Sequence, residues 1–255
     1  MEESRSAHPF PGLVVVLDIR GFGGLTNPEK LVARNQLYAL VAKAFEDAGL
    51  RWDDCAHEDR GDGIVVVLPA IVPKPLVMGP VLSGLIRGVA QAPPLNQVWT
   101  MAVRIAAHAA EIHRDDNGFA GSDVDLAFRL VDSPVLREAL DRAPSRCVVL
   151  VSDALHQSTV RHRYPGMDER VFHQVPVSVK ETSTTGWLHI PGDDRTAREV
   201  AAAHREPVTP SPPAHTTQMQ VGGDITANSG VVANGQVTIG SAPRRSWWRR
   251  GEGTR

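Results

Sequence analysis

Two apolar runs, each with an aspartate at or beside one end, most constrain the fold of this chain. The first, Gly12 to Ile19 (GLVVVLDI), contains Asp18 near its end, and the second, Ile64 to Leu68, follows Asp62 and a glycine. Short continuous apolar runs bounded by turn residues are typical of strands that are buried on both faces of a sheet. The sequence therefore predicts two core strands, with a carboxylate where each strand meets a turn.

The rest of the chain predicts a mixture of strands and helices. Thr26 and Glu29 stand at capping-box spacing, with Pro28 in the first turn, and predict a helix that runs to about Ala48 and stops at Gly49. Further strands are expected at residues 99–107 and 147–152 and within 171–190, and further helices at about 74–89, 122–130 and 134–140. Because this order lacks regular βαβ alternation, it favours an α+β fold.

Charge and composition exclude some classes of protein. The 255 residues carry a formal net charge of −2, which argues against nucleic-acid binding by the chain as a whole. The N-terminal MEESRSAHPF has no apolar core of signal-peptide length, and no run of 18 apolar residues occurs. We therefore expect a cytoplasmic protein in which Cys55 and Cys147 are buried thiols.

Changes in composition predict four regions. Residues 1–10 are an N-terminal extension, and residues 11–192 are the predicted α+β domain. Residues 193–218 are a linker, with a short exposed helix at about 195–205 and a stiff PVTPSPP segment. Residues 219–255 are a Gly/Asn/Val-rich tail with a basic end that contains tryptophans, and we expect this tail to be flexible.

Asp18 and Asp62 are the residues that the sequence marks most clearly for chemistry. A carboxylate at a strand end beside glycines presents oxygen ligands to Mg²⁺, which completes its coordination with water and phosphate. The glycines from Gly21 to Gly24 let backbone N–H groups approach phosphate oxygens. Together these residues suit metal-assisted phosphoryl chemistry. The alternative is that Asp18 caps a turn and Asp62 is a turn residue before a strand.

Four motifs in order resemble one protein family. They are LDIRGFGGL (Leu17 to Leu25), RGDGIVVVLP (Arg60 to Pro69), VRIAAHAAEI (Val103 to Ile112) and GSDVDLAFRL (Gly121 to Leu130). The first two are similar to the metal motifs of class III adenylyl and guanylyl cyclases, at the spacing that this family shows. The last two are similar to the family's Gly-x-His-x-Gly-Glu strand and its Val-Asn-x-Ala-x-Arg helix. Val179-Lys180-Glu181 is similar to the Lys-Gly of the family's C-terminal hairpin.

The resemblance identifies the chain as a divergent member of the class III nucleotide cyclases, of the actinobacterial type. It implies a ferredoxin-like fold with a central antiparallel or mixed sheet. It also implies a homodimer, docked head to tail, with composite sites at the interface. In such a site Mg²⁺ or Mn²⁺ and a nucleoside triphosphate meet, and the ribose 3′-oxygen attacks the α-phosphate to give a cyclic nucleotide and pyrophosphate.

The family's functional positions carry over residue by residue. Asp18, Ile19 and Asp62 match the metal site, and Phe22 and Gly23 match the loop whose backbone cradles phosphates. Arg129 matches the arginine that stabilises the transition state, whose fixed charge suits a developing phosphorane.

Several positions depart from the family. Asp125 stands where the family has asparagine, and an anion there repels phosphate unless a cation compensates. Glu58 stands at a base-reading position and favours guanine, or a relaxed or pyrimidine choice. Gly118 stands at the second base-reading position, where its missing side chain weakens base specificity, and Gly23 replaces a Thr or Ser.

Two functions therefore remain open. One is a metal-dependent cyclase domain that forms a cyclic nucleotide in signalling or bacterial defence. The alternative is a catalytically degenerate sensor or dimerisation module whose tail recruits or assembles with an effector protein. The segment Gln236 to Gly240 resembles the core of amyloid signalling motifs, although the tail composition also suits disorder or solenoid-like rungs. Arg244 to Arg250, with two tryptophans, suits a weak contact with an anionic membrane.

Overall fold

The computed structural model describes residues 8–205, 226–227 and 230–231. The chain divides into two compact units, residues 1–207 and 208–255. In the second unit, strands β9 (Thr226–Ala227) and β10 (Gly230–Val231) form an antiparallel pair. The other described elements belong to the first unit, which is an α+β structure, as the sequence predicts.

One mixed sheet organises the first unit. Its strands run in the order β2-β3-β1-β4-β6-β8-β7, and β5 pairs with β4. Neighbouring strands are antiparallel, except that β4 and β6 are parallel. The strands are β1 (Phe10–Ile19), β2 (Ala56–Asp59), β3 (Gly63–Pro69), β4 (Val103–Asp115), β5 (Gly118–Ala120), β6 (Cys147–Ser152), β7 (His173–Val179) and β8 (Thr182–His189).

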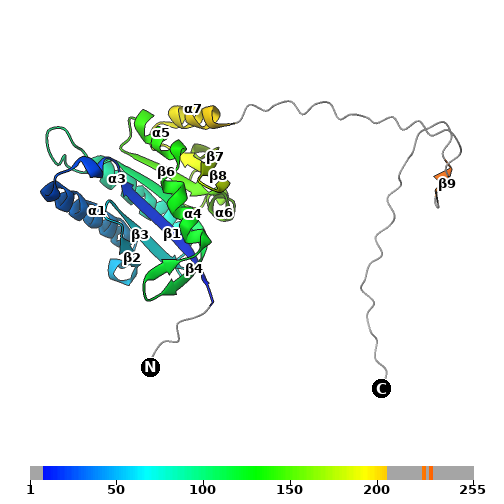
Figure 1. Ribbon diagram of the computed structural model, residues 1–255, viewed down its shortest axis with the longest axis horizontal. Helices are drawn as coiled ribbons and strands as arrows, with labels where there is room; N and C mark the ends of the chain where they lie inside the picture. The colour runs from blue at the N-terminus through cyan, green and yellow to red at the C-terminus, as the bar shows by residue number, and fades with distance from the viewer. Residues whose placement is uncertain (1–7, 206–225, 228–229, 232–255) are drawn as a thin grey trace, which may run out of the picture. The chain divides into compact units, whose positions relative to one another are not determined.

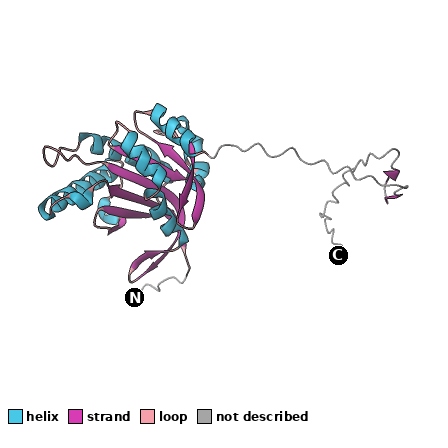
Figure 2. Ribbon diagram, turned by 45° about the horizontal axis from the view of Figure 1, so that its top comes forward, coloured by secondary structure: helices cyan, strands magenta, loops and turns pink. Residues whose placement is uncertain are grey.

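Helices cover both faces of this sheet (Figures 1 and 2). One core contains apolar residues of α1, α3 and α6, and the other contains those of α4, α5 and α7. The helices are α1 (Asn27–Asp47), α2 (Lys74–Leu76), α3 (Leu82–Gln91), α4 (Ser122–Val131), α5 (Pro134–Arg142), α6 (Asp153–Ser158) and α7 (Asp194–His204). A π-helical turn (Val77–Val81) that contains Pro80 joins α2 to α3, so the single helix expected at residues 74–89 is divided.

Strand β1 lies inside the sheet and is buried on both faces, as its apolar run predicts. Leu13, Val15 and Leu17 belong to the core of α1 and α3, whereas Val14 and Val16 belong to the core of α4 and α5. Each of these side chains is at most 4% exposed. Since full burial of such a side chain stabilises a fold by roughly 1.5–3 kcal/mol, this strand anchors both layers of helices.

The register of β1 brings the end of the strand against the turn before β3. Asp18 lies opposite Gly63 on β3 and opposite Arg104 on β4. A Cβ atom at Gly63 would lie 2.2 Å from the carbonyl oxygen of Leu17, so only glycine fits there. The N–H of Ile19 donates to the carbonyl oxygen of Asp62 at 2.9 Å. The two aspartate-bearing turns are therefore joined through the backbone.

Helix α1 begins at the predicted capping box. The backbone N–H and the hydroxyl of Thr26 each donate to Oε2 of Glu29 at 2.8 Å. Gly49, with a φ of +81°, follows the end of the helix, where a left-handed residue favours glycine. The predicted start and stop of this helix are both confirmed.

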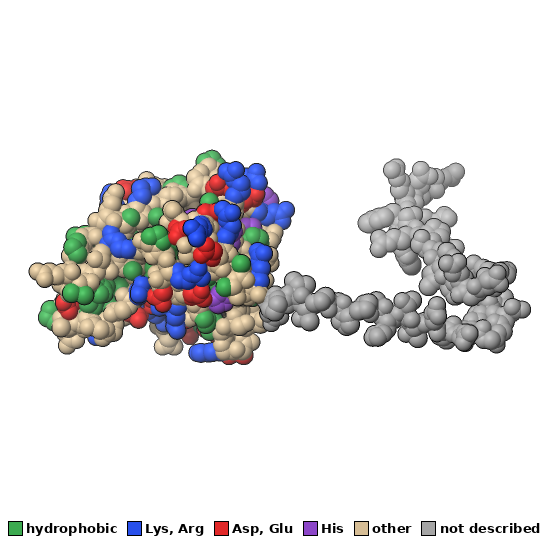
Figure 3. Space-filling model, turned by 90° about the horizontal axis from the view of Figure 1, so that it is seen from above, with side chains coloured by type: hydrophobic (Ala, Val, Ile, Leu, Met, Phe, Trp, Pro, Cys, Tyr) green, Lys and Arg blue, Asp and Glu red, His purple; other side chains and the backbone are tan. Residues whose placement is uncertain are grey.

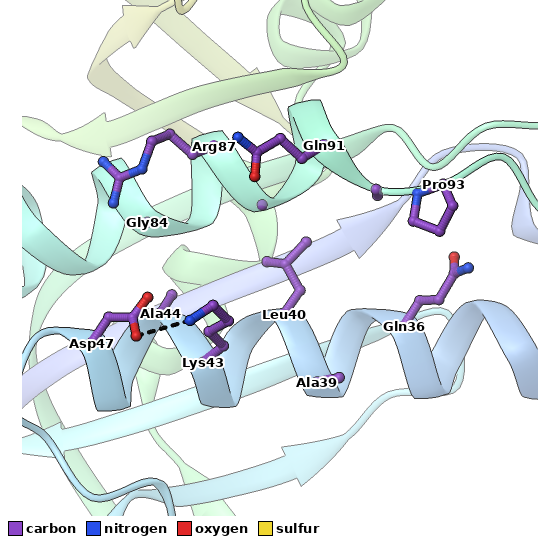
Figure 4. A pocket seen from close by; sticks show the side chains of 12 residues that line it. Gln36, Ala39, Leu40, Lys43, Ala44, Asp47, Gly84, Arg87, Gln91 and Pro93 are labelled. Atoms are coloured by element: carbon purple, nitrogen blue, oxygen red, sulfur yellow. Dashed lines mark hydrogen bonds and ion pairs between the residues drawn. The ribbon is translucent and has the colours of Figure 1, made fainter.

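Small residues let α1 and α3 approach each other closely. A Cβ atom at Gly88 would lie 2.7 Å from Cγ of Leu40, and one at Gly84 would lie 3.1 Å from Cβ of Ala44. A cavity of about 380 Å³ lies between the two helices. Figure 4 shows Leu40 pointing from α1 toward α3, with the ion pair of Lys43 and Asp47 beside it.

Helix α7 corrects an expectation from the sequence. The linker was expected to begin with an exposed helix, but Ala197, Val200 and Ala201 are at most 2% exposed and belong to the core of α4 and α5. Both ends of the helix are also tied to the domain. His173 and Asp194 hydrogen-bond at 2.6 Å, and His204 and Glu138 hydrogen-bond at 2.8 Å. The physical reason is an apolar stripe at helical spacing, which is too short to stand out in the sequence.

The outer face of α5 and α7 is polar. Figure 3 shows acidic and basic side chains interspersed on this face. Arg142 pairs with Glu138 at 3.1 Å and with Glu199 at 2.9 Å, which links the two helices. Exposed pairs of this kind contribute little stability, so the buried stripe of α7 supplies most of its attachment.

The predictions for the tail fall mainly on residues that the structure does not describe. They are the PVTPSPP segment, Gln236 to Gly240 and Arg244 to Arg250. Among the described residues, no helix is long and apolar enough to cross a membrane. The predicted boundaries of the domain and the tail stay predictions.

The packing of α7 predicts that the same substitution costs much more stability on its buried face than on its exposed face. Ala201→Glu places an unpaired charge at a position that is 2% exposed, and we expect it to lower the free energy of unfolding by about 3 kcal/mol or more. Ala203→Glu makes the same change on the exposed face and should alter the free energy of unfolding by no more than about 0.5 kcal/mol. Urea denaturation measures both. Equal effects from the two variants would show that α7 is a detached linker helix.

Candidate functional site

Asp18 and Asp62 line one cavity of about 280 Å³ at the end of β1. Its other lining residues are Val16, Leu17, Arg60, Gly63, Phe128, Val131 and Asp132. The side chain of Asp18 is 14% exposed, whereas Asp62 is exposed. The structure thus brings together the two carboxylates that the sequence singles out, and it adds Asp132 from the end of α4.

Arg104 holds the carboxylate of Asp18 in place. Its Nε donates to Oδ2 of Asp18 at 2.9 Å, and its Nη2 donates to the same oxygen. The guanidinium side chain is 12% exposed, so the pair lies largely out of water. Sequence analysis did not single out Arg104, although a charged residue inside a buried strand is a signal that can be found.

Burial raises the pKa of Asp18 above its ordinary value of 3.8. Arg104 opposes this shift, whereas the nearby charges of Asp62 and Asp132 reinforce it. An ionised carboxylate that is partly desolvated and faces other carboxylates is stabilised by a cation, and oxygen ligands are those that Mg²⁺ and Mn²⁺ prefer. The donor set at this cavity therefore fits a divalent metal.

The protein supplies only part of such a coordination sphere. Among the described residues, no group of three or more His, Cys, Asp or Glu side chains is arranged to hold a metal ion. Mg²⁺ usually takes one or two carboxylates and keeps waters or phosphate oxygens as its other ligands. Asp18 and Asp62 thus suit a metal that arrives with a phosphate, and Ile19 contributes the backbone bond that joins their turns.

The glycine loop after β1 forms a tight turn. Gly21 has a φ of +73°, and the residues Phe22–Gly24 form a single 3₁₀ turn. At Gly23 and Gly24 no heavy atom lies within 4 Å of the place that a Cβ atom would take. Phe22 packs against the core, and Nζ of Lys30 lies 5.7 Å from the centre of its ring. The loop therefore presents open backbone beside a cation.

Arg129 and Asp125 line a second cavity, of about 610 Å³, between α4 and β7. They lie four residues apart on α4, so both project from one face of the helix. Arg129 donates to the carboxylate of Glu181 and to the hydroxyl of Thr182, both from the β7–β8 hairpin. Lys180, with a φ of +51°, lines the same cavity.

Phe128 and Asp132 connect this cavity to the first. Both residues line the cavity of Asp18 and the cavity of Arg129. Asp132 forms an ion pair with Arg137 at 2.8 Å. Sequence analysis did not identify Asp132, because only the packing of α4 on the sheet places this residue at both cavities.

Glu58 and Gly118 meet at a third cavity, of about 360 Å³, between β2 and the β4–β5 hairpin. Oε1 of Glu58 accepts a hydrogen bond from the N–H of Phe119 at 3.0 Å, and Oε2 accepts one from Arg60 at 2.7 Å. The guanidinium of Arg60 lies 4.7 Å from the centre of the Phe128 ring. Arg60 therefore reaches from this cavity to that of Asp18.

Solved structures with a similar fold include nucleotide cyclases. The adenylate/guanylate cyclase/hydrolase from Silicibacter pomeroyi matches with a TM-score of 0.51 and 19% identity, over 73% of this chain and 99% of that chain. The catalytic core of a rhodopsin-guanylyl cyclase with converted specificity, in complex with ATPαS, matches with a TM-score of 0.50 and 14% identity, over 71% of this chain and 96% of that chain. No protein-family model and no curated protein matches the chain.

These likenesses confirm the predicted fold. The chain has the α+β fold of the class III nucleotide cyclase catalytic domain, with a central mixed sheet. At such low identity the likeness extends to the fold alone, so the chemistry has to be argued from the residues of this chain.

The raised pKa of Asp18 predicts that Asp18→Asn stabilises the metal-free protein at pH 7. Burial disfavours the ionised form of Asp18 and so lowers the stability of the folded protein. This loss of stability is complete above the raised pKa, and it disappears as the pH falls through that pKa. The gain in melting temperature should therefore be largest at neutral pH and should vanish near about pH 4. Thermal unfolding in EDTA across this range measures it.

The matched control is Asp62→Asn, since Asp62 is exposed. This variant should show no comparable gain at any pH. An Asp18→Asn variant that is less stable than wild type at pH 7 would contradict the prediction. It would show that the ion pair with Arg104 outweighs the cost of burial.

Proposed function

We propose that this chain is a divergent class III nucleotide cyclase-like domain that binds a nucleoside triphosphate with Mg²⁺ or Mn²⁺ and forms a cyclic nucleotide. One observation carries the proposal. On a cyclase fold, Asp18 and Asp62 face a common cavity, and Asp18 is held in a desolvated position that favours a cation. The rhodopsin-guanylyl cyclase core with the same fold was solved in complex with ATPαS, which supports a triphosphate as ligand.

Asp18 and Asp62 would hold the metal through carboxylate oxygens. The bound metal supplies Lewis-acid stabilisation of the phosphate oxygens as charge develops on them. Arg104 keeps the carboxylate of Asp18 oriented through two hydrogen bonds to one of its oxygens. The backbone of Phe22 and Gly23 offers the open surface against which phosphates would lie.

Arg129 and Lys180 supply positive charge at the second cavity. In the proposed reaction the ribose 3′-hydroxyl loses its proton to solvent and its oxygen bonds to the α-phosphorus. The bond from the α-phosphorus to the oxygen that bridges to the β-phosphate breaks, and pyrophosphate leaves with that oxygen. A fixed guanidinium stabilises the additional charge of that transition state. Asp125 lies four residues before Arg129 and places an anion on the same face, so we expect weaker phosphate binding than an asparagine would allow.

A head-to-tail homodimer is part of the proposal. Each chain carries a carboxylate cavity and a cationic cavity, and a symmetric dimer would bring the first of one chain to the second of the other. We further propose a cytoplasmic protein of the actinobacterial type, without nucleic acid as a partner. A weak contact with an anionic membrane and an effector protein bound through the tail also stay proposals.

One observation favours the alternative, a sensor or dimerisation module that has lost turnover. Arg129 is already bound by Glu181 and Thr182. Such a module would bind a triphosphate, or only dimerise, and pass the signal to an effector through the tail. Chemistry on the nucleotide therefore separates the two functions.

Turnover is tested by incubating the protein with each of the four nucleoside triphosphates and Mn²⁺, followed by mass spectrometry of the products. We expect a cyclic nucleotide and pyrophosphate from at least one triphosphate. Asp18→Ala and Asp62→Ala should reduce the rate by at least about a hundredfold, because the metal loses a ligand. Asp47→Ala, an exposed carboxylate on α1, is the control and should retain the rate.

The absence of product from all four triphosphates would exclude the cyclase. If the protein forms no product but still binds a triphosphate, the sensor module remains as the function. Nucleotide affinity that is unchanged in both Asp18→Ala and Asp62→Ala would exclude the metal site for either function.

The composite site predicts complementation between two inactive variants. Asp62→Ala destroys the carboxylate half and Arg129→Ala destroys the cationic half, so each homodimer should be inactive. An equal mixture forms heterodimers with one intact site, and we expect it to recover up to about a quarter of wild-type turnover. The test is the rate of cyclic nucleotide formation, measured as increasing amounts of Arg129→Ala are added to a fixed amount of Asp62→Ala. No recovery, with heterodimers shown by native mass spectrometry, would contradict the head-to-tail arrangement.

A further inference from the structure

The cavity between α1 and α3 has the size of a small-molecule site. Its volume is about 380 Å³, and pockets for such ligands range from about 300 to 1,000 Å³. It shares no lining residue with the cavities of Asp18, Glu58 and Arg129. Helices α1 and α3 also belong to one core, whereas α4, which borders two of those cavities, belongs to the other. The cavity is therefore separate from the proposed nucleotide site.

The middle of this cavity is apolar and is bordered by small residues. Ala39 and Ala44 line it from α1, and Gly84 and Gly88 line it from α3. Leu40 points from α1 into the space between the helices (Figure 4). Ligand sites are typically apolar in this way, with a few polar groups that fix the orientation of the ligand. The middle of the cavity therefore suits an apolar ring or a short chain.

One end of the cavity contains a buried hydrogen-bond acceptor. Figure 4 shows Gln36 at this end, beside Pro93. The Oε1 atom of Gln36 is buried and accepts no hydrogen bond from the described residues. Buried polar groups are nearly always paired in native proteins, because an unpaired group costs free energy. A ligand that brings an N–H donor to this end would satisfy Gln36.

The other end of the cavity has an excess of positive charge. Lys43 and Asp47 form an ion pair at 3.0 Å, so their charges offset each other. Arg87 lines the same end, and its guanidinium has no ion pair or hydrogen bond within the part of the chain that the structure describes. An arginine binds a carboxylate with two parallel hydrogen bonds. Arg87 is therefore available to an acidic ligand.

We propose that the cavity between α1 and α3 binds a small amphipathic carboxylic acid. Its carboxylate would lie on Arg87, its apolar body over Leu40, and an N–H donor on Gln36. Gln36 and Lys43 lie about two turns apart on α1, or about 10 Å along the helix axis, which sets the length of the ligand. The inference does not depend on the proposed function.

The test is calorimetric titration of the full chain with indole-3-butyric acid, which combines a ring N–H, an apolar ring and a carboxylate. We expect a Kd of about 1 mM or tighter, the affinity that about 15 non-hydrogen atoms give at the efficiency of drug-sized ligands. Arg87→Gln should weaken binding about tenfold, and Gln36→Met about fivefold.

Two altered probes assign each loss to one contact. The 1-methyl derivative of the probe lacks the N–H, so wild type and Gln36→Met should bind it alike. The carboxamide of the probe lacks the charge, so wild type and Arg87→Gln should bind it alike. Each comparison is a double-mutant cycle between one side chain and one group of the ligand.

A matched pair of tryptophan substitutions tests the location. Ala39 and Asn35 are both exposed on α1, so neither change disturbs the core, but only Ala39 lines the cavity. Ala39→Trp should fill the cavity and abolish detectable binding, whereas Asn35→Trp should bind the probe as wild type does. Asp62→Ala should also bind like wild type, because Asp62 lies at the proposed nucleotide site.

Several results would overturn the inference. One is no binding of the probe by wild type at about 1 mM. Another is an equal loss in Asn35→Trp and Ala39→Trp, or a loss in Asp62→Ala, since the probe would then bind elsewhere. Unchanged affinity in both Arg87→Gln and Gln36→Met would remove the proposed contacts. Affinity that falls as the protein concentration rises would assign the cavity to a second copy of the chain.

Discussion

The ionised carboxylate of Asp18, largely buried at the end of the central strand, is the feature on which the rest of the site depends. Two cores fix β1 from both faces, so this carboxylate cannot turn away to solvent. Arg104 on the neighbouring strand compensates only part of the cost, and burial still raises the pKa of Asp18. The fold thus keeps a position that a divalent cation would stabilise, at the expense of its own stability.

The other parts of the site are arranged around that position by contacts between distant segments. Helix α4 brings Asp132 to the cavity of Asp18 and Arg129 to the next cavity. Arg60 joins Glu58 to Phe128, so the cavity that contains Glu58 is connected to the carboxylate cavity through one guanidinium.

The sequence predicted those features that depend on local pattern. Apolar periodicity and capping residues identify β1, β3 and α1, and the motif order identifies the fold. It did not predict the pairing of Arg104 with Asp18 or the contact of Gly118 with Glu58, because both join residues that only the sheet register brings together. It also expected α7 to be exposed, since three small apolar residues decide its burial only when a partner surface is known.

The central claim is that Asp18 and Asp62 bind a divalent metal together with a triphosphate. Anomalous diffraction from crystals grown with Mn²⁺ and a triphosphate analogue that cannot cyclise tests this most directly. We predict a manganese peak within about 2.5 Å of carboxylate oxygens of both Asp18 and Asp62, with phosphate oxygens completing the coordination. A triphosphate bound without manganese at these carboxylates, or manganese bound elsewhere, would contradict the claim.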